Sequence, residues 1–139
     1  YYILNRQNLG QVVDITGNSK SNGANVESWA LNYGNNQRFT FTLGSDGYYT
    51  IKNVGSGLML DVAWDSTSRG ANVEQYKANG GTNQKWVVKA EGSYVSIRSL
   101  NGGYYLDTFG GRAYNGANFD IWDGHSNNNQ GQYFKLNKV

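Results

Sequence analysis

The 139-residue sequence contains no cysteine and no proline, and only 16% of its residues are charged. Without cysteine there is no disulfide framework, no thiolate nucleophile and no cysteine-ligated zinc. The sequence has no apolar run long enough to span a bilayer and no recognisable signal peptide, so we expect no membrane insertion. It begins at Tyr1 rather than at methionine, which is typical of a mature chain or of a module cut from a larger protein.

Strong charge of either sign is also missing. The formal net charge is +2, and the twelve Lys and Arg residues are scattered without a run. The sequence has neither a phosphate-binding glycine-lysine motif nor a basic stripe interleaved with aromatics, so we expect no nucleic-acid partner. Few charges together with eleven Tyr, four Trp and five Phe residues suit a neutral polar ligand.

The chain contains one pattern three times. A Gly-Ala-Asn triplet begins at Gly23, Gly70 and Gly116, at intervals of 47 and 46 residues. An aspartate that follows an apolar residue precedes each triplet, and a glutamine two residues before an aromatic follows it. A fixed period of this kind indicates one supersecondary unit used three times. We therefore expect a single domain over 1–139, built from repeat 1 (1–47), repeat 2 (48–93) and repeat 3 (94–139).

Each repeat contains four short apolar segments separated by glycine-rich turn signals, which is typical of an all-β protein. Their apolar positions superpose from repeat to repeat, with Leu4, Ile51 and Ile97 as one expected set. No stretch keeps helical spacing over ten residues. About twelve short strands in threefold arrangement must protect their edges, and closure into a barrel does so.

This set of motifs resembles the ricin B-type lectin domain, which overlaps the family 13 carbohydrate-binding modules, and the resemblance covers the whole chain. It implies a β-trefoil, in which a six-stranded barrel is closed by three hairpins and each repeat has one potential sugar pocket. It also implies that the aromatics after the glutamines, Phe39, Trp86 and Phe134, are core residues. The expected ligand is carbohydrate, with neither a cofactor nor a metal.

The resemblance also assigns roles within each pocket. The aspartate accepts hydrogen bonds from two sugar hydroxyls, which suits an acceptor with two charged oxygens. An aromatic ring covers the C–H face of the sugar, an asparagine binds hydroxyls, and the glutamine supports the pocket through backbone hydrogen bonds. An acid two residues before the aromatic either binds a further hydroxyl or points to solvent. The candidate residues are Asp14, Glu27, Trp29, Asn36 and Gln37 in repeat 1, Asp61, Glu74, Tyr76, Asn83 and Gln84 in repeat 2, and Asp107, Asp120, Trp122 and Gln132 in repeat 3.

Two departures from this pattern leave alternatives open. Gly131 stands where the other repeats have the pocket asparagine, so Asn129 or Gln130 from the longer loop of repeat 3 would have to reach in. Trp64 and Phe109 follow the pocket aspartates and are either pocket walls or exposed hairpin tips. The aspartates themselves have a structural alternative as turn caps, and the stacking aromatics as half-buried surface residues.

The sequence favours non-catalytic binding of galactose-type sugars, or of a polysaccharide such as galactan, arabinan or xylan, through up to three weak pockets acting by avidity. We expect an extracellular module attached to a glycoside hydrolase. The alternatives are a free-standing galactose-binding lectin or hemagglutinin, and a protein-binding β-trefoil such as a protease inhibitor. Catalysis is not expected, because no carboxylate pair defines a cleft and the lone His125 lies in a loop without a serine motif.

Overall fold

The computed structural model describes residues 1–124 and 130–139, and these form an all-β protein with short 3-10 turns between strands. None of the helical segments in these ranges is long and apolar enough to cross a membrane. The predicted twelve short strands are confirmed. They are β1 (Tyr2–Asn5), β2 (Asn8–Ile15), β3 (Val26–Ala30), β4 (Phe39–Leu43), β5 (Tyr49–Asn53), β6 (Met59–Val62), β7 (Val73–Tyr76), β8 (Trp86–Glu91), β9 (Tyr94–Ser99), β10 (Tyr105–Thr108), β11 (Phe119–Trp122) and β12 (Phe134–Asn137).

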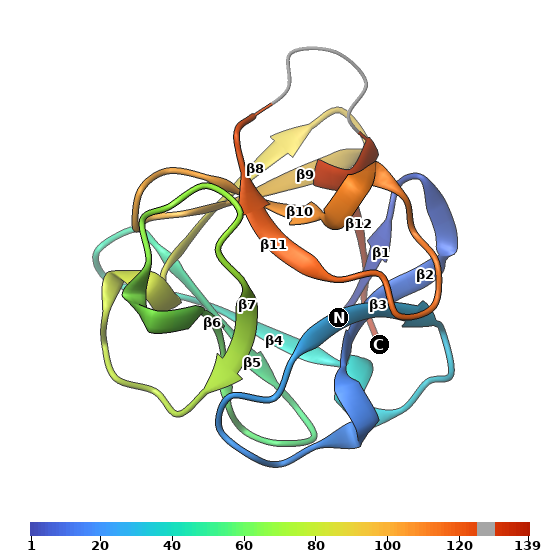
Figure 1. Ribbon diagram of the computed structural model, residues 1–139, viewed down its shortest axis with the longest axis horizontal. Coiled ribbons are helices and arrows are strands. Elements are labelled where there is room, and N and C mark those ends of the chain that lie inside the picture. The colour runs from blue at the N-terminus through green and yellow to red at the C-terminus, as the bar shows by residue number, and fades with distance from the viewer. Residues whose placement is uncertain (125–129) are drawn as a thin grey trace.

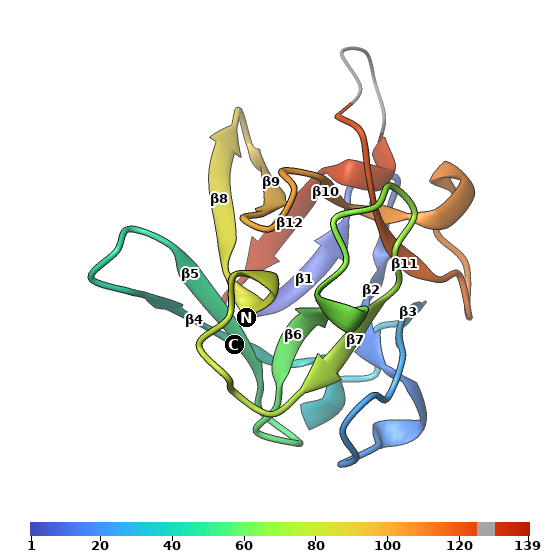
Figure 2. The ribbon, with the colours of Figure 1, turned by 60° about the vertical axis from the view of Figure 1, so that its left-hand side comes forward.

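Six of the strands close into a barrel. Antiparallel pairing runs from β1 through β12, β9, β8 and β5 to β4. The ring closes where the amide of Phe39 donates to the carbonyl of Tyr1 and the amino terminus of Tyr1 donates back to the carbonyl of Phe39, both at 2.8 Å. Because β1 pairs with β12, the two termini lie side by side (Figures 1 and 2). Closure of the barrel pairs the strand edges that would otherwise be exposed to solvent.

Three further hairpins complete the β-trefoil. They are β2–β3, β6–β7 and β10–β11, and Figure 1 shows them as three lobes arranged around the barrel. Each hairpin continues from a barrel strand, since β2 pairs with β1, β6 with β5 and β10 with β9. Each repeat supplies four consecutive strands, which are β1–β4, β5–β8 and β9–β12. The side chains of a hairpin therefore occur in three related environments.

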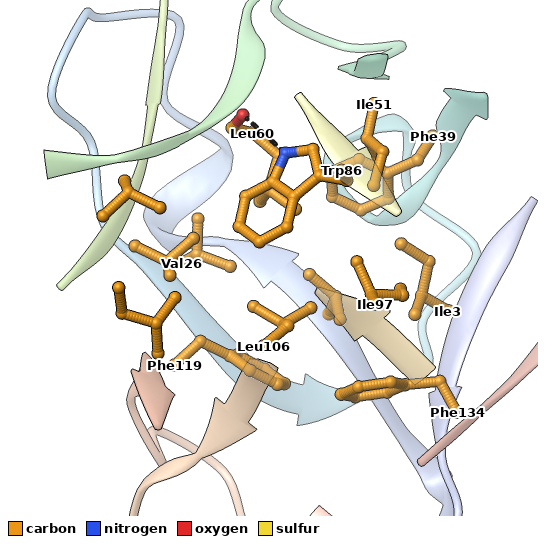
Figure 3. Packing of buried hydrophobic residues seen from close by; sticks show 14 of the residues in the cluster. Ile3, Val26, Phe39, Ile51, Leu60, Trp86, Ile97, Leu106, Phe119 and Phe134 are labelled. Carbon is orange, nitrogen blue, oxygen red and sulfur yellow. Dashed lines mark hydrogen bonds between the residues drawn. The ribbon is translucent and has the colours of Figure 1, made fainter. Parts of the chain in front are cut away.

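The barrel is filled by the aromatics that the resemblance assigns to the core. Phe39, Trp86 and Phe134 are at most 1% exposed, which confirms that prediction. Figure 3 shows them in one cluster with aliphatic residues from all three repeats. Trp86 additionally donates its indole N–H to the carbonyl of Leu60 at 3.2 Å, so its polar atom has a partner inside the core.

The expected correspondence of Leu4 with Ile51 and Ile97 is wrong by one residue. Ile3, rather than Leu4, packs in the main cluster with Ile51 and Ile97, and it pairs with Leu136 of the neighbouring strand β12. Leu4 belongs to a second, smaller cluster with Tyr2 on the other side of the strand. Both side chains are buried. Strand alternation assigns a face only when one side is polar, and here it could not choose between the two.

The recurring Gly-Ala-Asn triplets meet at the centre of the hairpin end. The side-chain amide of Asn25 donates to Oδ1 of Asn118, that of Asn118 to Asn72, and that of Asn72 back to Asn25, at 2.8, 2.8 and 2.9 Å. Each asparagine therefore gives and receives one bond in a closed ring. This ring ties the three repeats together and explains why the triplet occurs in all of them.

Candidate functional site

The carboxylate of Asp61 lies at the floor of the repeat-2 site, on β6, where it is only 3% exposed. Two side-chain amides hold one of its oxygens. Asn83 donates to Oδ2 at 3.1 Å and Gln84 at 2.8 Å. Within the described ranges no residue donates to Oδ1. The two oxygens of this carboxylate therefore differ, because both amide donors of the described residues reach Oδ2.

The two amides are positioned by a 3-10 turn, η4 (Thr82–Gln84). Gln84 also donates to the carbonyl of Lys77 at 2.9 Å and accepts from the amide of Asn79 at 3.0 Å. Asn83 also donates to the carbonyl of Val62 at 3.2 Å. The side chain of Gln84 thus makes its hydrogen bonds to the backbone and to Asp61. The resemblance implies a supporting role of this kind. A carboxylate held in this way is fixed before any ligand arrives.

Repeat 1 reproduces this network almost atom for atom. Asn36 and Gln37, from the turn η2 (Asn35–Gln37), donate to Oδ2 of Asp14 at 3.1 and 2.8 Å. Gln37 also donates to the carbonyl of Ala30 at 3.0 Å. Asp14 is 3% exposed, and its Oδ1, like that of Asp61, receives no hydrogen bond from a described residue.

Burial sets the electrostatics of these two carboxylates. Loss of solvent raises the pKa of Asp14 to about 6, and the Gln37 hydrogen bond only partly opposes that rise. Burial raises the pKa of Asp61 to about 6 in the same way, against the Gln84 hydrogen bond. Cross-strand neighbours add to the rise, because Glu27 faces Asp14 and Glu74 faces Asp61. Both aspartates are ionised at neutral pH.

In both hairpins an aromatic residue lies two positions along the paired strand from the residue opposite the aspartate. Trp29 on β3 is 40% exposed and Tyr76 on β7 is 38% exposed. The repeat-2 site is an open pocket of about 1020 Å³, and Asp61, Asn83, Glu74 and Tyr76 all line it. A ring exposed next to a buried anionic acceptor offers an apolar face and a hydrogen-bonding group to the same ligand.

Repeat 3 differs, because its two acids face each other. Asp107 and Asp120 are directly opposite in the β10–β11 register and are 6% and 3% exposed. Burial, a hydrogen bond to Asp107 and the charge of Asp107 together raise the pKa of Asp120 to about 8. The glutamates in the equivalent positions, Glu27 and Glu74, are one methylene longer and only half buried. In repeat 3 the acid is turned toward its neighbouring carboxyl, and Oδ1 of Asp120 is buried without a described hydrogen-bond partner.

The amide of the other two sites is also missing from repeat 3. Gly131 has no side chain to offer, and the nearby Thr108 hydroxyl donates to the carbonyl of Gly131 at 3.2 Å while accepting from Asn5 at 2.7 Å. Gln132 keeps its supporting role and donates to the carbonyl of Asp123 at 2.7 Å. Asn129, His125 and the side chain of Gln130 lie outside the described residues.

An arginine from the adjacent repeat covers the aromatic ring of repeat 3. The guanidinium of Arg69 lies 4.9 Å from the centre of the Trp122 ring and pairs with Asp123 at 2.8 Å. Sequence reasoning missed this contact, although a signal was present. Asn22 and Asn115 precede the other two Gly-Ala-Asn triplets, and Arg69 replaces them.

The structure therefore brings the predicted residues together in all three repeats but builds two kinds of site. Repeats 1 and 2 have an anionic oxygen without a described donor beside an exposed aromatic. Repeat 3 has a carboxyl pair and an aromatic under an arginine. Among the described residues, no group of three His, Cys, Asp or Glu side chains lies close enough to hold a metal ion.

The chain resembles known proteins in both sequence and structure. A family model described as ricin-type beta-trefoil lectin domain-like matches residues 1–76 and 35–122. The designed threefold symmetric protein ThreeFoil superposes with a TM-score of 0.94 at 33% identity, over 100% of this chain and 98% of its own. The exo-beta-1,3-galactanase 1,3Gal43A of Clostridium thermocellum superposes with a TM-score of 0.93 at 31% identity.

The galactanase and a further relative, flavastacin, are longer proteins than this chain. The superposition on the galactanase covers 100% of this chain but 30% of the galactanase chain. Flavastacin of Elizabethkingia meningoseptica is 43% identical over 42 residues, which are 30% of this chain and 10% of flavastacin. The chain thus spans less than a third of the galactanase, and 42 of its residues match a tenth of flavastacin.

Proposed function

The chain belongs to the family of ricin-type beta-trefoil lectin-like domains, and we propose that it binds carbohydrate, without catalysis, at the sites of repeats 1 and 2. One observation carries this proposal. In both repeats a buried aspartate has one oxygen held by two amides and the other without a described donor, next to an exposed aromatic. This pairing suits a sugar, which presents hydroxyl donors at its edge and C–H groups on its face.

Repeat 3 is proposed to be closed to sugar. Its aspartate already shares a hydrogen bond with Asp120, and Arg69 occupies the face of Trp122. Single protein–sugar sites are weak, because each hydrogen bond gained replaces one to water. Two sites on one rigid domain would compensate through avidity on a polymer or a crowded surface.

We propose galactose-type sugars as ligands and attachment to a glycoside hydrolase as the setting. The similarity to 1,3Gal43A supports both, since that protein is an exo-beta-1,3-galactanase and this chain matches 30% of its length. An extracellular location is part of the same proposal, because a module of this kind would hold an enzyme on polysaccharide outside the cell.

Binding rather than hydrolysis is proposed because the carboxyl geometry does not suit a glycosidase. Such enzymes hold two carboxyl groups about 5–10 Å apart on either side of the scissile bond. Asp107 and Asp120 instead hydrogen-bond to each other and are almost fully buried. They leave no room for a sugar between them.

The test is calorimetric titration with galactose, lactose, β-1,3-galacto-oligosaccharides, arabino-oligosaccharides and xylo-oligosaccharides. We expect two sites per chain for one sugar class. Asp14→Asn and Asp61→Asn should each leave one site, while Asp107→Asn, the matched control in repeat 3, should leave two. Silence across the panel would overturn carbohydrate binding, and three equivalent sites would overturn the closed repeat 3. A hydrolytic assay on the same ligands should give no product.

A further inference from the structure

Trp64 is the most exposed large apolar side chain of the described molecule, at 96% exposure. It lies in the turn η3 (Ala63–Asp65) between β6 and β7, and it lines the same open pocket as Asp61 and Tyr76. A tryptophan left in water contributes no burial to folding. The exposure therefore needs an explanation outside the fold.

The backbone at Trp64 makes this position still more unusual. Its φ is +61°, in the left-handed region that a bulky side chain rarely adopts. The equivalent residues of repeats 1 and 3 are Gly17 and Gly110, with φ of +63° and +72°. The turn has a positive φ at this position in all three repeats, a conformation that favours glycine. Repeat 2 carries a tryptophan there at a conformational cost that the fold does not repay.

The strained turn is held in place by a neighbouring repeat. Asn101, in the loop between β9 and β10, donates its side-chain amide to the carbonyl of Asp65 at 2.9 Å, to Oδ1 of Asp65 at 2.8 Å and to the carbonyl of Ser66 at 3.2 Å. The backbone that presents Trp64 is thus fixed before a ligand binds, which lowers the entropy that binding would cost.

The two aromatics of this pocket stand toward opposite ends of the hairpin. Tyr76 pairs with Met59 at one end, Asp61 pairs with Glu74 in the middle, and Trp64 follows Val62 at the other end. At about 3.4 Å per residue, the span from Met59 to Val62 alone is roughly 10 Å. The pocket of about 1020 Å³ is at the upper end of the volumes that hold small ligands. Its lining includes both Tyr76 and Trp64, so the pocket extends along the hairpin.

We propose that Trp64 is a second stacking platform, which makes the repeat-2 site a receptor for a linear oligosaccharide of at least two sugar units. One unit lies on Tyr76 with its hydroxyls on Asp61, and a following unit lies on Trp64. The repeat-1 site, with Gly17 in place of the tryptophan, takes a single terminal unit. This inference rests on the proposed function and adds the class of ligand to it.

The test compares a monosaccharide with its linear trisaccharide in an Asp14→Asn background, which leaves repeat 2 as the open site. The pairs are galactose with β-1,3-galactotriose and xylose with xylotriose. Trp64→Gly installs the residue that both other repeats carry, so the fold is expected to be retained and its Tm to rise. We expect the affinity for the trisaccharide to fall about tenfold and that for the monosaccharide to stay unchanged.

Two further variants separate stacking from indirect effects. Trp64→Phe keeps an aromatic ring and should retain most of the trisaccharide affinity. Phe109→Ala removes an exposed aromatic, 60% exposed, from the equivalent turn of repeat 3 and should leave both affinities unchanged. If Trp64→Gly binds both ligands as its parent does, or loses both equally, the second platform is wrong while carbohydrate binding stands. If the Asp14→Asn parent binds neither pair, this inference fails, and only silence of the unsubstituted chain across the full sugar panel overturns the proposed function as well.

Discussion

The guanidinium carbon of Arg69 lies 4.9 Å from the centre of the Trp122 ring, although the two residues belong to different repeats. The equivalent side chains in the other units, Asn22 and Asn115, instead accept hydrogen bonds from the backbone amides of Lys77 and Ala30. One substitution in a loop thus changes the surface of the adjacent repeat. It covers the ring at the position where repeats 1 and 2 expose Trp29 and Tyr76.

Replacing Arg69 by asparagine should uncover Trp122. Arg69→Asn installs the residue found in the other repeats and removes an exposed ion pair with Asp123, so we expect a loss of less than about 1 kcal/mol in the free energy of unfolding. Acrylamide quenching of tryptophan fluorescence should increase. The number of sugar sites should stay at two, because the Asp107–Asp120 pair is untouched. A third site in this variant would show that Arg69 alone closes repeat 3.

Two substitutions of Asp61 should separate binding from stability. Asp61→Ala leaves two buried amides without their shared acceptor, so we expect the free energy of unfolding to fall by about 1–3 kcal/mol. Asp61→Asn keeps an acceptor oxygen for both amides and removes a desolvated charge, so its stability at pH 7.5 should equal or exceed that of the parent. Both should lose the repeat-2 site in calorimetry. Equal stability of the two variants in urea denaturation would argue against the amide network.

Binding should weaken in mild acid while the fold becomes more stable. The pKa of Asp14 and of Asp61 is raised to about 6, so at pH 5 each carboxylate is mostly protonated and affinity should fall about tenfold from its value at pH 7.5. Between about pH 4 and 6 the folded state holds more protons than the unfolded chain. These two groups therefore raise the free energy of unfolding as pH falls through that window.

Calorimetry and thermal unfolding on the same samples check both halves of this prediction. Asp61→Asn provides the internal control, because its repeat-2 carboxylate no longer titrates. Affinity that stays constant from pH 7.5 to 5 would mean that the aspartates do not bind the ligand as carboxylates.

Asp120 should destabilise the fold at alkaline pH. Burial and the contact with Asp107 raise its pKa to about 8, so the folded state holds the extra proton from about pH 4 up to pH 8. The free energy of unfolding falls as pH rises through that range. Asp120→Asn replaces the shared proton by an amide donor. We expect Asp120→Asn to raise the free energy of unfolding at pH 8 by about 1 kcal/mol relative to the parent. This corresponds to a rise in Tm of about 4 °C in a domain of this size.

The difference in Tm between Asp120→Asn and the parent, followed from pH 5 to 9, isolates the Asp107–Asp120 pair, since the titration of groups outside the pair cancels. The difference should grow with pH and level off above pH 8. A constant difference would show that Asp120 does not titrate in this range.

Repetition made most of the fold predictable. Because each strand occurs in three related copies, a weak signal in one repeat was supported by the other two. The core role of Phe39, Trp86 and Phe134 was implied by the resemblance to the ricin B-type lectin domain. Repetition did not distinguish Ile3 from Leu4, because these adjacent apolar residues are both buried on opposite sides of β1. Alternation carries no information when neither face is polar.

The sequence by itself determined the repeat unit and its four short strands, because these depend on patterns within one unit of about 46 residues. Its resemblance to the ricin B-type lectin domain implied the β-trefoil, the core aromatics and the residues that gather around each hairpin. Only the tertiary structure decided that the sites differ. The proton shared by Asp107 and Asp120 depends on burial across two strands, and the contact of Arg69 with Trp122 joins two repeats. The left-handed turn at Trp64 is held by Asn101 from the next repeat. Desolvation and contacts between repeats are set by distances in space, which a motif repeated along the chain does not specify.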